Sequence, residues 1–250
     1  MDLISVIIPY YKKKQFIDAS IKSVINQTYS NLEIILIYDD NDKSDLKYLI
    51  QKYDLNEKIK FVVNDKNIGA GLSRNKGMKL AKGNYICFID ADDIWEKNKL
   101  ETQLLFMKNT GSVISHTSYR IINEKDDLIG TRVAKNFSNI QEIIKSCDIG
   151  LSSVMLKKEI INDDIQFPNL KTKEDFVLWL KILKLGKEIS AIDQNLLSWR
   201  KTKNSLSSSI FQKLLDGFRV YNKFMGYNFF TSIYYLLCLS INYVIKRFND

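Results

Sequence analysis

Histidine and cysteine are scarce in this 250-residue sequence. The single histidine, His116, excludes a histidine-rich metal site and argues against a histidine-centred catalytic triad. Three cysteines without a C-x-x-C spacing give no disulfide framework and favour a reducing compartment. The first residues also lack the basic region and the long apolar run of a secretory signal. We therefore expect a protein that stays in the cytoplasm.

Basic residues outnumber acidic residues, and the excess is concentrated near the end of the sequence. The chain has 37 Lys and Arg against 29 Asp and Glu, a formal net charge of +8. Residues 201–250 hold seven of the basic and two of the acidic residues, so they carry five of the eight excess charges. This excess suggests an anionic partner, but composition does not distinguish nucleic acid, phospholipid and a phosphorylated small molecule.

Short apolar runs alternate with helical patterns in the first part of the chain. β-Branched and aromatic residues dominate residues 3–8, 33–38, 59–63 and 85–89, which predicts strands covered on both faces. Amphipathic or glycine-bounded helical segments lie between these runs. The alternation predicts an α/β fold with a mostly parallel sheet through about residue 115.

The pattern changes from about residue 116. We expect a β-hairpin, a helix, a strand, a second helix and two short strands, at 118–133, 139–146, 151–156, 174–185, 188–192 and 196–200. No repeat or low-complexity linker separates the two parts. We therefore predict one catalytic domain at 1–207, with halves at 1–115 and 116–207, followed by a tail at 208–250.

Acidic residues follow two of the predicted strands. Asp39 and Asp40 come after the second strand, and Asp90, Asp92 and Asp93 come after the fourth. Ligands of a parallel sheet bind beyond the carboxyl ends of its strands, so both clusters are expected on one ligand-binding edge. Carboxylates packed so closely repel one another unless a cation lies among them, and a hard divalent cation suits such oxygen ligands.

Five segments together resemble the family 2 glycosyltransferases, which have the GT-A fold. They are SVIIPYY at 5–11, SVINQTY at 23–29, YDDNDKSD at 38–45, NIGAGLSRNKGMKLAKGNYICFIDADD at 67–93 and KEDFVLWLKILKLG at 173–186. The resemblance covers about residues 3–207 and implies a Rossmann-like, mostly parallel sheet flanked by helices. It also implies an inverting transferase of the bacterial polysaccharide type. Such an enzyme moves a sugar from a nucleotide-sugar donor, most commonly a UDP-sugar, to a hydroxyl of a glycan or polyprenyl-linked acceptor.

The resemblance assigns the acids after the fourth predicted strand to the donor and its metal. Asp92 and Asp93 would hold Mn²⁺ or Mg²⁺, while Asp90 and Asp92 would belong to the donor site. A divalent cation that bridges a diphosphate needs only one or two protein carboxylates. Alternatively, Asp93 caps a helix that begins near Glu96.

The resemblance also assigns residues after the first three strands to the donor. Asp39 or Asp40 would accept a hydrogen bond from the nucleotide base, and Tyr11 would stack on the base or simply pack. Lys12 stands where the family usually has Asn, and D-D-N-D replaces the usual D-D-G-S. Pro9, Asn67 and Arg74 complete this part of the donor site. Arg74 would lie near the nucleotide or its diphosphate, or form a salt bridge to an aspartate of the same edge, and both roles are compatible.

The E-D pair of KEDFVLWLK matches the position of the general base in this family. Asp175 would take the proton of the attacking hydroxyl, with Glu174 as its neighbour, although an acid at a helix start also serves as a cap.

Residues 199–207 resemble the loop that closes over the diphosphate, with Arg200 as a donor contact. Thr202 replaces the usual histidine there, and Lys201 or Lys203 would compensate. The alternative is an exposed basic loop.

The tail contains 22 consecutive uncharged residues at 224–245, followed by Lys246 and Arg247. Its length would permit a membrane span, but polar residues dilute it, so attachment at the inner face of the cell membrane is the preferred interpretation. A helix packed on the enzyme is the alternative.

The competing functions are a metal-dependent nucleotidyltransferase and a non-catalytic anion- or membrane-binding module. No sheet face interleaves basic and aromatic residues, so we expect no nucleic-acid partner.

Overall fold

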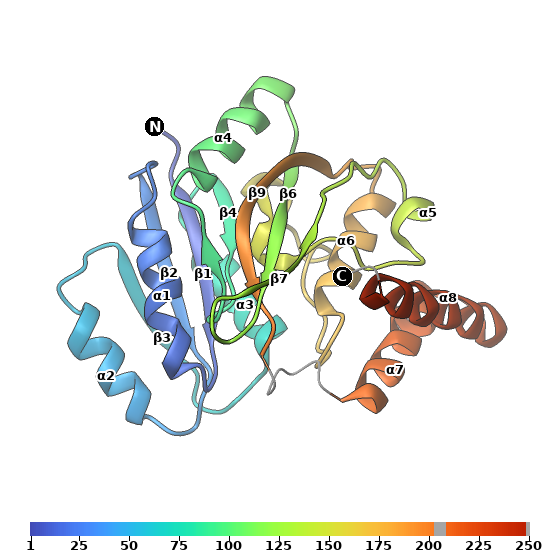
Figure 1. Cartoon of the computed structure of the whole chain (residues 1–250), viewed down its shortest axis with the longest axis horizontal. Coiled ribbons are helices and arrows are strands. Elements are labelled where there is room, and N and C mark those ends of the chain that lie inside the picture. The colour runs from blue at the N-terminus through green and yellow to red at the C-terminus, as the bar shows by residue number, and fades with distance from the viewer. Residues whose placement is uncertain (203–208, 249–250) are drawn as a thin grey trace.

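The computed structural model describes residues 1–202 and 209–248 (Figure 1). Within these residues, nine strands form one sheet in the order β3-β2-β1-β4-β8-β6-β9-β5, with β7 paired to β6. Helices flank this sheet, and α7 and α8 lie at the opposite end of the molecule from α2 (Figure 1). The predicted α/β fold is therefore present.

The four strands of the first half are parallel, as predicted. They are β1 (Ile4–Tyr10), β2 (Leu32–Tyr38), β3 (Ile59–Val63) and β4 (Tyr85–Phe88), joined through α1 (Lys14–Ile25), α2 (Ser44–Tyr53) and α3 (Ala70–Leu80). All seven residues of β1 are buried, which explains its almost continuous apolar sequence. Gly77 of α3 lies directly on β1, because a Cβ at this position would be 2.5 Å from Cγ2 of Ile7.

The second half makes the complete sheet a mixed one. Its elements are β5 (Ile94–Trp95), α4 (Lys99–Thr110), β6 (Ile114–Ile122), β7 (Leu128–Arg132), α5 (Ile140–Ile143), η1 (Leu151–Ser153), β8 (Met155–Lys157), η2 (Lys158–Ile160), α6 (Glu174–Lys184) and β9 (Ser190–Arg200). The predicted hairpin is β6–β7. Two short strands were expected at 188–192 and 196–200, but they are one strand, β9, with register shifts against β6. The predicted helix at 139–146 is reduced to one turn, α5.

Alternate side chains of β1 enter two apolar layers, one on each face of the sheet. Ile4, Val6 and Ile8 pack in a layer that includes residues of α1, α2 and α4. Ile7 packs in the other layer, with residues of α3 and α6. The carboxyl ends of β1, β2 and β4 lie between these layers, so the loops that follow them are held by a rigid core.

The C-terminal segment packs against the second layer. It consists of α7 (Ile210–Arg219), the π-helical turn η4 (Val220–Phe224) and α8 (Phe229–Phe248). The buried residues Val220, Tyr221 and Leu239 share a core cluster with α6. The Tyr221 hydroxyl also donates a hydrogen bond to the carbonyl of Ile144 at 2.7 Å. The predicted boundary at 207/208 lies outside the described residues.

Candidate active site

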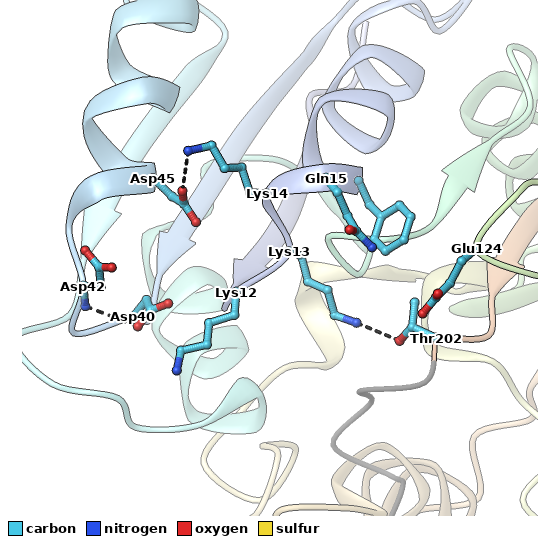
Figure 2. A pocket seen from close by; sticks show the side chains of 10 residues that line it. Lys12, Lys13, Lys14, Gln15, Asp40, Asp42, Asp45, Glu124 and Thr202 are labelled. Atoms are coloured by element: carbon cyan, nitrogen blue, oxygen red, sulfur yellow. Dashed lines mark hydrogen bonds and ion pairs between the residues drawn. The ribbon is translucent and has the colours of Figure 1, made fainter.

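A hollow of about 580 Å³ opens at the carboxyl end of β1 (Figure 2). Its wall comes from the loop after β1, the start of α1, the loop after β2, the hairpin loop and the end of β9. The charged residues that line it are Lys12, Lys13, Lys14, Asp40, Asp42, Asp45 and Glu124, and the uncharged ones are Gln15, Phe16 and Thr202. We did not predict the lysines as site residues, although three consecutive lysines directly after the first strand signalled a cationic edge.

Asp39 holds the loop that leads into α3. Its Oδ1 accepts hydrogen bonds from the side-chain amide of Asn64 at 2.8 Å and from the backbone N–H of Ile68 at 2.9 Å. Its Oδ2 accepts from the N–H of Gly69 at 2.8 Å. Asn67 supports the same loop by donating to the Asp39 carbonyl. Gly69 has φ +89°, a conformation that glycine adopts without strain. The Asp39 carboxylate is therefore committed to building the loop.

Asp40 is the member of this pair that lines the hollow. Nearby, Pro9 is buried within β1 as its second-last residue, and Tyr11 lies on the following loop with its side chain exposed. Lys12 has φ +50°, in the left-handed region that Asn tolerates better than most residues. That conformation explains why Asn would suit this position. A base contact by Asp40 and stacking on Tyr11 stay predictions.

Buried Arg74 joins the two halves of the site through two partly buried ion pairs. Its Nη2 lies 2.6 Å from Oδ1 of Asp90, and its Nη1 lies 2.8 Å from Oε1 of Glu174. The guanidinium also lies over the ring of Phe167 at 5.6 Å. Burial disfavours its charge, yet the two carboxylates raise the pKa of Arg74. The predicted salt bridge of Arg74 is therefore present. Together with the ion pair to Glu174, it connects the D-A-D-D turn to the start of α6.

Asp92 faces a cation supplied by the protein. Its Oδ2 lies 2.7 Å from Nζ of Lys13, which also donates to Oγ1 of Thr202 at 2.8 Å. Burial raises the pKa of Asp92, and the charge of Asp90 acts in the same direction, while Lys13 opposes both. Lys13 is therefore the nearest positive charge that holds Asp92 ionised.

Asp93 is fully buried behind Asp92. Its Oδ1 accepts a hydrogen bond from the backbone N–H of Arg200 at 2.8 Å. Within the part of the chain that the structure describes, its Oδ2 is buried without a hydrogen bond of normal geometry, and the nearby Ser152 hydroxyl acts to lower the pKa of Asp93. Burial, followed by the charges of Asp92 and Asp90, raises the pKa of Asp93 well above its ordinary value. An unsatisfied buried oxygen of this kind carries a free-energy cost unless a proton or a cation meets it.

Arg200 is buried and held by oxygen atoms of the protein. Its Nε donates to the Asp92 carbonyl at 2.9 Å, and its Nη1 lies 2.6 Å from a carboxylate oxygen of Asp126. The ring of Phe16 lies 4.6 Å from its guanidinium carbon. Arg200 thus holds the end of β9 against the D-A-D-D turn. Its contact with the donor diphosphate stays a prediction. Residues 203–208 of the predicted closing loop, including Lys203, lie outside the described residues.

The E-D pair begins α6. Lys173, immediately before it, has φ +66°, a strained conformation for a lysine. Burial raises the pKa of Glu174 to about 7, and Arg74 moderates that shift. Burial also raises the pKa of Asp175, whose Oδ1 accepts a hydrogen bond from the N–H of Phe176 at 2.7 Å. Asp175 is the half-buried member of the pair that lacks an ion pair among residues 1–202 and 209–248.

We tested whether these carboxylates suit a divalent cation. Among residues 1–202 and 209–248, no three His, Cys, Asp or Glu side chains gather to hold a metal ion alone. A cation that also binds a diphosphate needs only one or two protein carboxylates. Asp92, which pairs with Lys13, and Asp93, whose Oδ2 is buried, are the two carboxylates of the D-A-D-D turn that such a cation would use.

Comparison with known proteins assigns the family. A family model described as "Glycosyl transferase family 2" matches residues 5–157. The chain belongs to glycosyl transferase family 2. This glycosyltransferase is 36% identical over 245 residues to the UDP-Glc:alpha-D-GlcNAc-diphosphoundecaprenol beta-1,3-glucosyltransferase WfgD of Escherichia coli, covering 97% of this chain and 92% of that protein. It is 30% identical over 247 residues to the putative teichuronic acid biosynthesis glycosyltransferase TuaG of Bacillus subtilis, covering 98% and 97%.

A solved structure supports the fold of this glycosyltransferase. It is similar to residues 1–349 of TarS from S. aureus, crystallised with UDP-GlcNAc, with a TM-score of 0.74 and 22% sequence identity. The match covers 90% of this chain and 65% of that chain. The GT-A fold and the predicted family are thereby confirmed.

Proposed function

We propose that this glycosyltransferase moves a sugar, with inversion, from a UDP-sugar to a hydroxyl of a glycan or polyprenyl-linked acceptor in cell-surface polysaccharide synthesis. The observation that carries the proposal is that Arg74 forms ion pairs with both Asp90 and Glu174. They hold the D-A-D-D turn, suited to a diphosphate and its cation, against the segment that contains Asp175. The two named relatives support the class of acceptor, because one acts on a diphosphoundecaprenol-linked sugar and the other is assigned to teichuronic acid synthesis.

The residues around the hollow would bind the donor. Asp40, which lines the hollow, would accept the N–H of the base, and the exposed ring of Tyr11 would stack on it. Lys12 and Lys13 supply positive charge on the same edge, where a diphosphate needs it. Mn²⁺ or Mg²⁺ held by Asp92 and Asp93 would stabilise the negative charge of the departing nucleoside diphosphate.

Asp175 would act as the general base. It removes the proton of the acceptor hydroxyl as that oxygen bonds to the anomeric carbon, while the bond from this carbon to the diphosphate oxygen breaks. The raised pKa of Asp175 makes it a stronger base than an exposed aspartate. A single displacement inverts the configuration. UDP-glucose carries its sugar in the α configuration, and the E. coli relative is named a beta-1,3-glucosyltransferase, so inversion agrees with that relative.

The acceptor chemistry implies a location. A polyprenyl-linked saccharide is held in a bilayer by its lipid, and nucleotide sugars are substrates dissolved in the cytoplasm. The enzyme would therefore work in the cytoplasm, at the inner face of the cell membrane.

A donor screen tests the proposal. Purified full-length protein is incubated with UDP-, GDP- and dTDP-sugars, a polyprenyl-diphosphate-linked GlcNAc acceptor, and Mn²⁺, Mg²⁺ or EDTA. We expect release of a nucleoside diphosphate together with a lengthened lipid-linked saccharide, and loss of both with EDTA. Release of pyrophosphate would indicate nucleotidyl transfer instead. No release from any donor would contradict the proposal.

A further inference from the structure

Helix α8 is apolar on two opposite faces. Its inner face packs Leu239 into the core, with Tyr235 and Leu236 beside it. Its outer face carries residues at the helical spacing i, i+4, i+7, i+11, i+14 and i+15 that are about half exposed or more. We define them as the outer stripe: Phe230, Tyr234, Leu237, Ile241, Val244 and Ile245. No charged residue lies between 224 and 245. A helix that is apolar on two opposite faces is normally covered on both of them.

Helix α7, which packs against α8, also carries exposed apolar side chains. A Cβ at Gly217 would lie 2.8 Å from Cδ1 of Leu236, so α7 and α8 pack closely. On α7 the exposed apolar residues are Ile210, Phe211, Leu214 and Leu215. The combined exposed apolar surface of α7 and α8 is larger than scattered single residues would give.

The charges around this surface are positive. Within residues 209–245 the single acidic residue is Asp216, which is fully buried and accepts hydrogen bonds from Thr172. Lys223 is exposed, and exposed Arg219 forms an ion pair with Asp216 at 3.1 Å. The ammonium groups of Lys145 and Lys213 lie 5.5 Å and 5.0 Å from the rings of two tyrosines of α8, Tyr234 and Tyr243. Tyrosines next to lysines at the edge of an apolar face are typical of a membrane interface.

This charge distribution favours a lipid over a second copy of the chain. A two-fold interface would bring the same basic residues of both copies together without exposed acidic partners from these helices. Anionic headgroups complement these cations. Among the described residues, no helix has the length and apolarity needed to cross a bilayer, so a surface-bound helix is the geometry left for a lipid contact.

We propose that the outer stripe of α8, with the exposed apolar residues of α7, docks on an anionic bilayer surface, with α8 in the plane of the interface. The proposal rests on the proposed function, since a lipid-linked acceptor gives the docking its use. A direct connection runs from this surface to the site. Thr172 donates from its N–H and its hydroxyl to Oδ2 of Asp216 on α7, both at 3.1 Å, and it lies two residues before Glu174.

Vesicle flotation with the full chain tests the docking surface. The vesicles are pure phosphatidylcholine or phosphatidylcholine with phosphatidylglycerol. The variant Leu237→Gln/Ile241→Gln removes apolar contact without changing charge. Its matched control is Leu105→Gln on α4, because Leu105 and Leu237 are 59% and 57% exposed. Truncation is a poorer test, because removing α8 would also remove Leu239 from the core.

We expect wild type and Leu105→Gln to float with the anionic vesicles, and the double variant to bind them roughly tenfold or more weakly. Equal flotation of the double variant, or no flotation of wild type, would overturn the proposal. So would a dimer in light scattering that the double variant dissociates, since the stripe would then cover a second copy. Donor hydrolysis in the same samples reads the proposed function separately, because hydrolysis needs no membrane.

Discussion

Adjacent acidic residues lie at the ends of the strands and at the start of α6. In the two regions, different interactions hold one acid of each pair in place. At the strand ends, Asp39 and Asp93 accept hydrogen bonds from backbone N–H groups of segments distant in sequence. Asp40 instead lines the hollow, and Asp92 pairs with Lys13 of its wall. At the helix start, Glu174 turns toward Arg74 instead. In both regions one acid bonds to the protein framework, and we propose the other for a ligand. In our proposal Asp93 serves both purposes, through Oδ1 and Oδ2 respectively.

This difference explains why a pair of acids recurs at each place. A backbone loop around a buried carboxylate is rigid, because each N–H that it satisfies would be costly to leave unpaired. An ion pair to Arg74 achieves the same positioning across two segments that are far apart in sequence. Substitutions of the two members of a pair should therefore separate stability from activity.

The largest difference is expected within the pair Glu174 and Asp175. Asp175→Asn keeps the shape but removes the base, so turnover should fall by ~10²–10⁴ while UDP affinity and the melting temperature stay near wild type. Asn can still accept the hydrogen bond of Phe176. Turnover, UDP calorimetry and a thermal melt measure these three quantities. Near-normal turnover would leave Asp175 with a helix-capping role only.

The pH profile provides an independent control for the same residue. A general base must be ionised, so wild-type turnover should be present above the raised pKa of Asp175 and fall as the pH drops through it. The residual turnover of Asp175→Asn should lack this acidic limb. An unchanged limb in the variant would assign it to another group, with Glu174 the first candidate.

The next difference is expected within Asp92 and Asp93. Either change to Asn should weaken metal-dependent UDP binding, by about tenfold or more, if both hold the cation. Without metal the two should diverge. Asp93→Asn removes a buried carboxylate whose raised pKa costs stability as pH rises through it, so its melting temperature at neutral pH should increase. Asp92→Asn also removes a carboxylate with a raised pKa, but it loses the Lys13 ion pair, so its melting temperature should rise less. Equal melts would contradict the division.

Asp39 and Asp40 should separate in the opposite way. Asp39→Ala leaves the N–H groups of Ile68 and Gly69 and the amide of Asn64 without their acceptor, at about 1–3 kcal/mol for each group left buried. Asp40→Ala should weaken UDP binding severalfold with little effect on unfolding. Denaturant unfolding and UDP titration of both variants make the comparison. A more stable Asp39→Ala than Asp40→Ala would reverse our assignment.

The sequence predicted the parallel strands well and the contacts between motifs poorly. Residues 59–63 form β3 as expected, but β3 is a partly exposed edge strand, so the expected cover on both faces is wrong for it. Arg74 was placed near the donor or an aspartate, but its bond to Glu174 joins residues 100 positions apart, which no local pattern encodes. The single strand β9 appeared as two because polar residues at 193–195 interrupt the apolar pattern. Lys13 was missed because its role depends on a turn that brings Asp92 to it.

The smallest effect is expected at Lys13. Lys13→Met removes the ammonium beside Asp92, so UDP affinity should fall a few-fold, while affinity for Mn²⁺ alone should rise because a competing cation is gone. Lys22→Met, an exposed lysine of α1, is the matched control and should change neither. Calorimetry with UDP and with Mn²⁺ alone measures both affinities. Unchanged values for Lys13→Met would make the ion pair incidental to binding.

The central claim is a single displacement in which Asp175 activates the attacking oxygen. Proton NMR of the sugar released during slow hydrolysis of UDP-glucose, or of the donor that the screen identifies, tests it without knowledge of the acceptor. Water then takes the place of the acceptor hydroxyl, and the anomeric signal is followed before mutarotation mixes the two forms. We predict that the β anomer appears first. Initial formation of the α anomer would show retention and would contradict this mechanism.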